Sequence, residues 1–118
     1  MPPKIVFFDI DDTLFRKWQD FMPESVLPAF RALHEAGVLT AIATGRSPCA
    51  LPAKIRELIA AENIELFITI NGQYNQYRGE PLATNPMSIG EIERFNALFA
   101  RHGTRVTHAC FVTIASNA

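Results

Sequence analysis

Two acidic residues, Asp9 and Asp11, directly follow a short apolar run and are separated by one residue. A carboxylate can attack phosphorus and form an acyl phosphate, but a divalent cation must neutralise the charge of the phosphoryl dianion. Oxygen ligands select magnesium over softer metals. A second carboxylate can protonate the leaving oxygen and later take a proton from water. We therefore expect Asp9 to be a nucleophile and Asp11 an acid and base, with Asp9 and the backbone carbonyl of Asp11 binding Mg²⁺.

A second polar group of residues, Thr44-Gly45-Arg46, follows another apolar run. A hydroxyl, a glycine that lets backbone N–H groups approach closely and a guanidinium together form a plausible phosphate-binding loop. Taken alone, each motif also has a purely structural interpretation, since an acidic turn can simply cap a helix turn. Their occurrence after consecutive strands favours the functional interpretation.

The apolar pattern predicts three parallel strands at 4–8, 38–43 and 66–70. Helical spacing between them predicts one helix from Pro23 to Gly37 and a second with Leu51 to Ile59 on its apolar stripe. Strands that alternate with helices indicate a parallel α/β sheet with right-handed crossovers, and we expect helices on both of its faces. Both polar motifs then lie at the carboxyl edge of the sheet, where open α/β folds bind ligands.

The pattern changes after Asn71-Gly72. Residues 73–84 resemble a hairpin with its turn at Arg78-Gly79, and Asn85-Pro86 then breaks the pattern. Ser88 and Glu91 have capping-box spacing, which predicts a helix that ends near Gly103, and residues 105–114 resemble a last strand. We expect two domains, a core at 1–84 and the beginning of a second unit at 85–118.

The motifs Phe8-Asp9-Ile10-Asp11-Asp12-Thr13-Leu14, Ile42-Ala43-Thr44-Gly45-Arg46 and Ile70-Asn71-Gly72 resemble the haloacid dehalogenase-like hydrolases, within them the Cof-type sugar-phosphate phosphatases. The resemblance implies a partial Rossmann-like core of three parallel strands with flanking helices, then a hairpin and the start of an α+β cap. It implies a Mg²⁺-dependent phosphatase that acts on small phosphorylated metabolites through an aspartyl phosphate. By this resemblance Asp9 is the nucleophile, Asp11 the acid and base, and Thr44 a phosphate ligand, with Gly45 and Arg46 in the surrounding phosphate-binding loop.

The chain departs from the family pattern in three ways. Asp12 stands where many members have Gly, which we expect to be tolerated if its φ is not strongly positive. The family's later Lys is not matched, since the lysines are Lys4, Lys17 and Lys54, and no acid follows Glu93 to complete the metal shell. We therefore expect a truncated enzyme of doubtful activity. The alternatives are a non-catalytic binding or interaction module, or a subunit completed by another chain, including a homodimer formed through the exposed edge of strand 4–8.

Composition excludes several other classes of protein. The 118 residues carry a net charge of −1 and are 48% hydrophobic, which gives no electrostatic footprint for nucleic acid or an anionic membrane. No apolar run is long enough for a signal peptide or a membrane helix, so we expect a cytoplasmic protein. A receiver-like signalling domain is disfavoured because Thr69-Ile70-Asn71 has no acid to accept phosphate. We expect Trp18 and Phe21 to pack on the core, the alternative being a small flap over the site.

Overall fold

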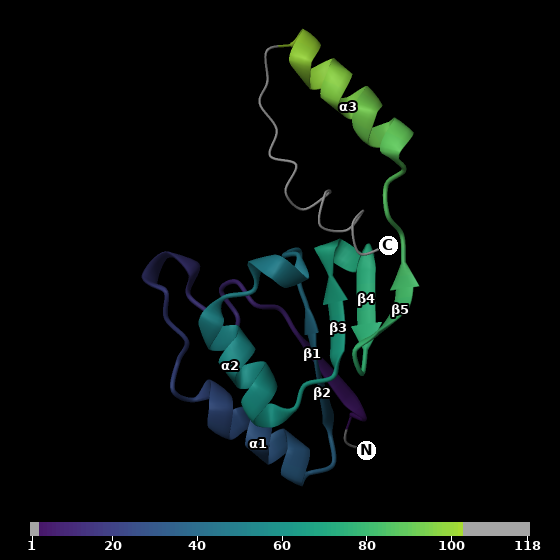
Figure 1. Ribbon diagram of the computed structural model, residues 1–118. Helices are drawn as coiled ribbons and strands as arrows, with labels where there is room; N and C mark the ends of the chain where they lie inside the picture. The colour runs from purple at the N-terminus through teal and green to yellow at the C-terminus, as the bar shows by residue number, and fades with distance from the viewer. Residues whose placement is uncertain (1–2, 103–118) are drawn as a thin grey trace. The chain divides into compact units, whose positions relative to one another are not determined.

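The computed structural model describes residues 3–102 (Figure 1). A five-stranded sheet has the order β1-β2-β3-β4-β5. Strands β1 (Ile5–Phe8), β2 (Leu39–Ala43) and β3 (Leu66–Thr69) are parallel, and β4 (Tyr74–Tyr77) and β5 (Glu80–Thr84) add an antiparallel hairpin. The helices are α1 (Val26–Glu35), α2 (Ala53–Glu62) and α3 (Ile89–Arg101), and the 3₁₀ turns are η1 (Lys17–Gln19), η2 (Pro48–Ala50) and η3 (Ile70–Gly72). The expected α/β core is confirmed.

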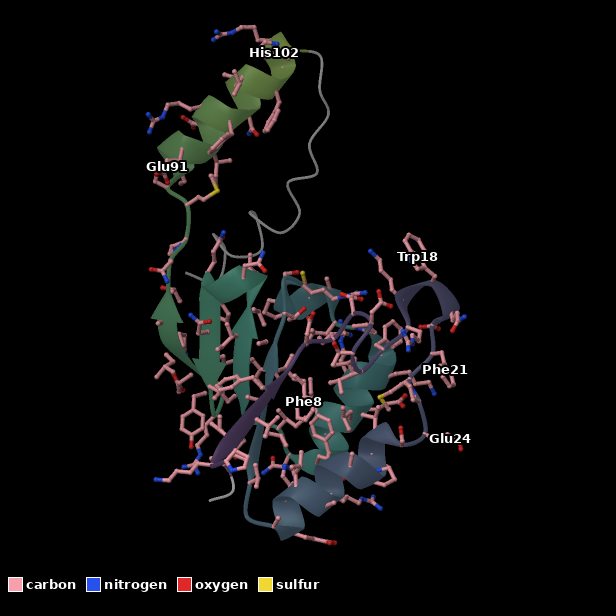
Figure 2. The ribbon with its side chains drawn as sticks, turned by 180° about the vertical axis from the view of Figure 1, so that it is seen from behind. Phe8, Trp18, Phe21, Glu24, Glu91 and His102 are labelled. Atoms are coloured by element: carbon pink, nitrogen blue, oxygen red, sulfur yellow. The ribbon has the colours of Figure 1, made fainter. Side chains whose placement is uncertain are left out.

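The hydrophobic core lies between the sheet and the helices α1 and α2. Phe8 pairs with Ile42 across β1 and β2, so their side chains share one face of the sheet. That face packs on Phe30 of α1 and on Ile55 and Leu58 of α2, all at most 2% exposed. The rings of Phe8 and Phe30 are 4.7 Å apart between centroids, and Figure 2 shows Phe8 at the centre of this layer. Both helices therefore cover the same face.

The expectation of helices on both faces is wrong for the residues that the structure describes. Two right-handed crossovers that proceed in the same direction, from β1 to β2 and on to β3, put both helices on one side. The other face carries Phe7, Leu39 and Tyr77, which are 47%, 59% and 39% exposed. The sheet consequently presents an apolar face that α1 and α2 do not cover.

A polar cluster joins α1, α2 and β2 at the sheet edge remote from the two polar motifs. Glu62 is buried and accepts from Arg31 Nε at 3.1 Å, and its other oxygen lies 3.3 Å from His34 Nδ1. The remaining ring nitrogen of His34 is 2.9 Å from the Thr40 hydroxyl. These bonds satisfy the buried carboxylate, so the cluster is accounted for as a structural tie between the elements.

The described residues divide into two compact units, one that ends at Thr84 and one that begins at Asn85. In the second unit, α3 begins with the expected capping box: Ser88 Oγ accepts from Glu91 N at 3.1 Å, and Ser88 N donates to Glu91 Oε2 at 2.8 Å. The strand expected at 105–114 lies outside the described residues. No helix between residues 3 and 102 has the length and apolar character needed to span a membrane.

Candidate active site

The first acidic loop is anchored by apolar residues on either side of its carboxylates. Ile10 is fully buried, and its carbonyl accepts from the amides of Thr13, Leu14 and Phe15 at 3.0–3.2 Å. Leu14 and Phe15 are each 4% exposed and belong to the core. The chain therefore turns tightly around one carbonyl, which fixes the backbone of the residues beside Ile10.

Asp9 follows the last residue of β1 and is exposed. Its Oδ1 accepts from the Ile10 amide at 2.8 Å, and this is its one hydrogen bond within residues 3–102. The bond orients the carboxylate at the carboxyl edge of the sheet and leaves the other oxygen open. Asp9 thus has the accessibility that a nucleophile or metal ligand requires.

Asp12 adopts a φ of +61°, in the left-handed region. We expected an acid to be tolerated here in place of Gly only if its φ were not strongly positive. That condition is not met, because L residues have a steric penalty in the left-handed region. The short polar side chain of Asp reduces that cost, and the Asp12 amide donates to the Phe15 carbonyl at 2.8 Å. The turn forms with Asp12, but with local strain.

The Thr44-Gly45-Arg46 loop continues β2 and is tied to the end of β3. Thr44 N donates to the Ile68 carbonyl at 2.8 Å, and Ile70 N donates to the Arg46 carbonyl at 3.0 Å. The Thr44 hydroxyl is buried, and its oxygen accepts from Arg46 N at 3.0 Å. That oxygen is held in one place while its proton remains available to an acceptor such as phosphate.

Asn71 is a neighbour of this loop that the sequence did not single out as a site residue. Asn71 N donates to the Thr44 carbonyl at 3.2 Å, and a Cβ added to Gly45 would lie 3.1 Å from Asn71 Oδ1. Ile70 and Asn71 both have a φ of +52°. A β-branched residue in the left-handed region is a genuine outlier, and such strain concentrates at functional sites. The feature of the sequence that pointed to Asn71 was the Asn-Gly turn signal at residues 71 and 72.

Arg46 meets Asp11 in a bidentate ion pair. Arg46 Nε donates to Asp11 Oδ2 at 2.9 Å and Nη2 donates to Oδ1 at 2.8 Å, while Nη1 donates to the Ala50 carbonyl at 2.8 Å. The hydrogen bonds from Arg46 hold the pKa of Asp11 below its ordinary value, against the opposing effect of burial. The same bonds to Asp11 raise the pKa of Arg46. Arg46 was expected to bind phosphate, but in this structure it binds Asp11, the expected acid and base.

The structure thus brings the two motifs to one sheet edge and joins them through Asp11 and Arg46. Thr44 is linked to Arg46, and Gly45 lies against Asn71, whereas no hydrogen bond of Asp9 within the described residues reaches the second motif. Trp18, expected on the core, is instead 89% exposed, and Phe21 is 47% exposed. Figure 2 shows Trp18 at the outer end of the loop that follows the acidic turn, away from the core.

The oxygen donors of the acidic loop suit a hard divalent cation, which prefers carboxylate and carbonyl ligands and keeps several waters. Asp9 supplies an open carboxylate oxygen. Between residues 3 and 102 no group of three or more His, Cys, Asp or Glu side chains gathers as a metal cage. The donor chemistry therefore fits Mg²⁺, with fewer protein ligands than a complete cage.

Comparison with known proteins agrees with these observations. Residues 6–117 match the model of the haloacid dehalogenase-like hydrolase family. A Bacillus subtilis protein named as the phosphatase YkrA is 33% identical over 94 residues, which are 80% of this chain and 35% of that protein. A Streptococcus pyogenes protein named as a bifunctional phosphatase and peptidyl-prolyl cis-trans isomerase is 42% identical over 71 residues, 60% of this chain and 14% of that protein.

Among solved structures, the sugar phosphatase BT4131 of HAD subclass IIB superposes with a TM-score of 0.74 at 33% sequence identity. The superposition covers 85% of this chain and 38% of that one. The chain therefore spans little more than a third of the length of this relative, and about as much of YkrA.

Proposed function

The chain belongs to the haloacid dehalogenase-like hydrolases, and from that premise we propose that it carries the nucleophile half of a phosphatase site for small phosphorylated metabolites, sugar phosphates above all. The observation that carries the proposal is the meeting of the two motifs at one sheet edge, where Arg46 holds Asp11 beside the open carboxylate of Asp9. The sugar-phosphatase relative supports the substrate class.

In the proposed reaction, Asp9 attacks phosphorus with its open carboxylate oxygen, and the bond from phosphorus to the leaving oxygen breaks. Asp11 protonates the leaving oxygen and then takes a proton from the water that hydrolyses the aspartyl phosphate. The Thr44 hydroxyl donates to a phosphate oxygen from a fixed position. In the free protein Asp11 is held as a carboxylate by Arg46. The proposal therefore requires that Arg46 loosens its hold when phosphate binds and that Asp11 takes up a proton from solvent before it acts as the acid.

The carboxylate of Asp9 and the backbone carbonyl of Asp11 are the proposed ligands of Mg²⁺. When bound, the cation offsets the negative charge of carboxylate and phosphoryl group. The family's later lysine and acids have no counterpart in the 118 residues, since the lysines are Lys4, Lys17 and Lys54 and no acid follows Glu93. We therefore propose that the chain by itself binds Mg²⁺ weakly and turns over slowly, and that full activity needs groups from outside it.

The unpaired edge of β1 supports a second proposal, that another chain completes this one. Within the described residues β1 pairs with β2 alone, and Phe7 and Leu39 on the uncovered face are about half exposed. Sheets of parallel strands are nearly always covered on both faces, and a free strand edge invites pairing. A second copy joined along β1 is the partner we propose.

The test of the phosphatase proposal compares hydrolysis of para-nitrophenyl phosphate, with and without Mg²⁺, by the wild-type chain and the Asp9→Asn and Asp12→Asn variants. We expect slow, Mg²⁺-dependent hydrolysis that Asp9→Asn abolishes and Asp12→Asn, a matched change in the same loop, retains. Equal rates for Asp9→Asn and wild type would overturn the assignment of the nucleophile. Fast hydrolysis that depends on Asp9 would show instead that no outside group is needed.

A further inference from the structure

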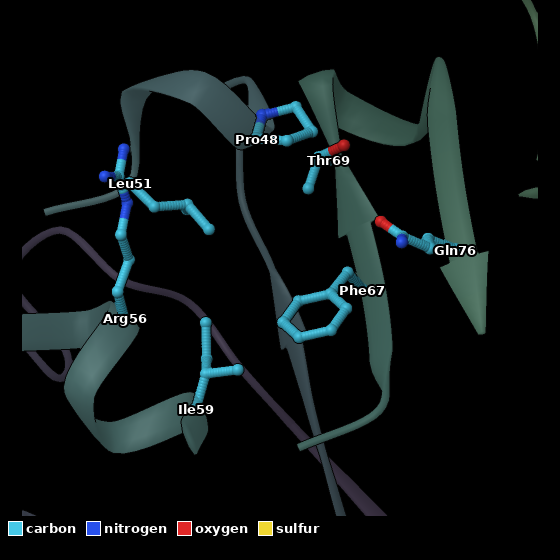
Figure 3. Close-up of a pocket in the computed structure, with 7 residues that line it drawn as sticks. All are labelled: Pro48, Leu51, Arg56, Ile59, Phe67, Thr69 and Gln76. Carbon is cyan, nitrogen blue, oxygen red and sulfur yellow. The ribbon is translucent and has the colours of Figure 1, made fainter. Parts of the chain in front are cut away.

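A second concave site lies on the helix-covered side of the sheet, beyond the cover that α2 provides. It is a pocket of about 250 Å³ between α2, β3 and β4 (Figure 3). Ile59 of α2 and Phe67 of β3 form its apolar walls, and Pro48 and Leu51 line it from the two ends of η2. All of these residues belong to the first unit, so the pocket is contained in one compact body.

Two polar groups border this apolar space. Among the seven described residues that line the pocket, Arg56 alone carries a charge. Arg56 Nη2 donates to the Cys49 carbonyl at 3.1 Å, which leaves the other N–H groups of the guanidinium available. The side-chain amide of Gln76 has no hydrogen-bond partner within residues 3–102, and Figure 3 shows it directed toward the pocket from β4, across from Arg56.

The position of Gln76 depends on an irregularity of the hairpin. The register of β4 with β5 shifts between Asn75 and Gln76, and Gln76 stands opposite Pro81. Such bulges redirect a side chain and recur beside functional sites. The third polar group of the pocket, the Thr69 hydroxyl, is already committed, because it donates to the Tyr74 carbonyl at 2.7 Å. The groups left for a ligand are therefore a cation on one wall and a neutral amide on the other.

We propose that this pocket binds a small aromatic acid that carries a hydrogen-bonding group at the end remote from its carboxylate. The carboxylate meets Arg56, the ring lies between Ile59 and Phe67, and the remote hydroxyl or carbonyl meets Gln76. Since a water molecule occupies about 30 Å³ of liquid, the pocket has room for on the order of ten non-hydrogen atoms. The proposal is independent of the proposed phosphatase activity.

The pocket and the candidate active site share η2 as a wall. The Ala50 carbonyl accepts from Arg46 Nη1 at 2.8 Å, and the Cys49 carbonyl accepts from Arg56. A carboxylate bound to the available N–H groups of Arg56 shares the guanidinium with the Cys49 carbonyl, and the ring contacts Pro48 and Leu51 at either end of the turn. We therefore expect a ligand in the pocket to change the environment of the Arg46 guanidinium, which holds Asp11.

The experiment is a ¹H–¹⁵N NMR titration of the full chain with 4-hydroxyphenylacetate. We expect saturable shifts confined to η2, α2, β3 and β4 and at the Arg46 Nε–H signal, with a dissociation constant of about 1 mM. Arg56→Met should weaken binding about five- to tenfold, whereas Lys54→Met, which removes a charge from the same helix outside the pocket, should not. The wild-type chain should bind the neutral 4-hydroxyphenylacetamide about five- to tenfold more weakly than 4-hydroxyphenylacetate. It should also bind phenylacetate more weakly, because that ligand lacks the hydroxyl that meets Gln76.

Three results would overturn the proposal. They are the absence of saturable shifts, shifts that map outside the pocket, and equal affinities for wild type and Arg56→Met. The backbone spectrum of each variant reports whether it is folded, and Gln76→Leu gives a second route if Arg56→Met does not fold. With Gln76→Leu, 4-hydroxyphenylacetate and phenylacetate should bind equally, and a retained preference for the hydroxyl would contradict the assignment of Gln76.

Discussion

Arg46 donates two parallel hydrogen bonds to Asp11, of 2.9 and 2.8 Å, across 35 residues of sequence. Their side chains are 23% and 35% exposed, so the pair lies between a surface ion pair and a buried one. A bidentate guanidinium adds geometric selectivity to the attraction, because two donors fix the plane of the carboxylate. This pair is what joins the acidic loop after β1 to the loop after β2.

The first prediction concerns the stability that this pair provides. Arg46→Gln should lower the free energy of unfolding at neutral pH by about 1 kcal/mol, the upper range for a partly exposed pair. Because the folded-state pKa of Asp11 is lowered from 3.8, this contribution is complete above that value and is lost as pH falls through the folded pKa. Urea unfolding at a series of pH values measures it. Arg94→Gln in α3 is the control, and a difference from wild type that does not shrink in acid would contradict the prediction.

The left-handed backbone at Asp12 gives a second prediction. Asp12→Ala should be less stable than Asp12→Gly by about 1 kcal/mol, because Ala has a Cβ penalty at a φ of +61° and no polar group to offset it. Chemical denaturation of the two variants under identical conditions tests this. Equal stabilities would mean that the turn relaxes out of the left-handed region.

Gly45 and Asn71 give a third prediction. Gly45→Ala should destabilise the chain by about 0.5–1 kcal/mol, because the new Cβ would lie 3.1 Å from Asn71 Oδ1 and the exposed Asn71 side chain must move aside. In the Asn71→Ala background the same change should cost nothing measurable. A double-mutant cycle by thermal unfolding measures the coupling, and additive effects would show that the two side chains are independent.

The unpaired edge of β1 gives a fourth prediction, which tests the proposed second copy. Light scattering should show association that increases with protein concentration, and Phe7→Lys, which places a charge on the edge strand, should reduce it. Leu82→Lys is a matched control, since Leu82 is 66% exposed on β5 at the other edge of the sheet. A wild-type chain that stays monomeric at high concentration would rule out pairing along β1.

Local patterns sufficed for much of the fold. The apolar runs before Asp9 and Thr44 predicted strands, although Phe7 and Leu39 within them are 47% and 59% exposed. Ser88 with Glu91 defined the start of α3 through bonds that form within one turn. The hairpin at Arg78-Gly79 was also readable, because glycine favours the left-handed conformation that Gly79 adopts in the turn between β4 and β5. These features depend on neighbours in sequence, and a sequence contains that information directly.

The placement of side chains by distant contacts could not be read in this way. The spacing of Trp18 after the acidic turn fitted a core residue as well as an exposed one, and its 89% exposure depends on where the loop leaves the core. Likewise, the side of the sheet that each helix covers follows from the direction of successive crossovers. Strand and helix periodicity carry no information on either point.

By itself the sequence determined which chemistry is available, two carboxylates after one strand and a hydroxyl, glycine and guanidinium after the next, and the α/β order that brings them to one edge. Only the tertiary structure decided that Arg46 binds Asp11, that Asn71 lies on Gly45, and that one face of the sheet is uncovered by α1 and α2. The physical reason is that residue types and periods set local conformation and burial, whereas the pairing of side chains from separate loops depends on strand register and crossover direction.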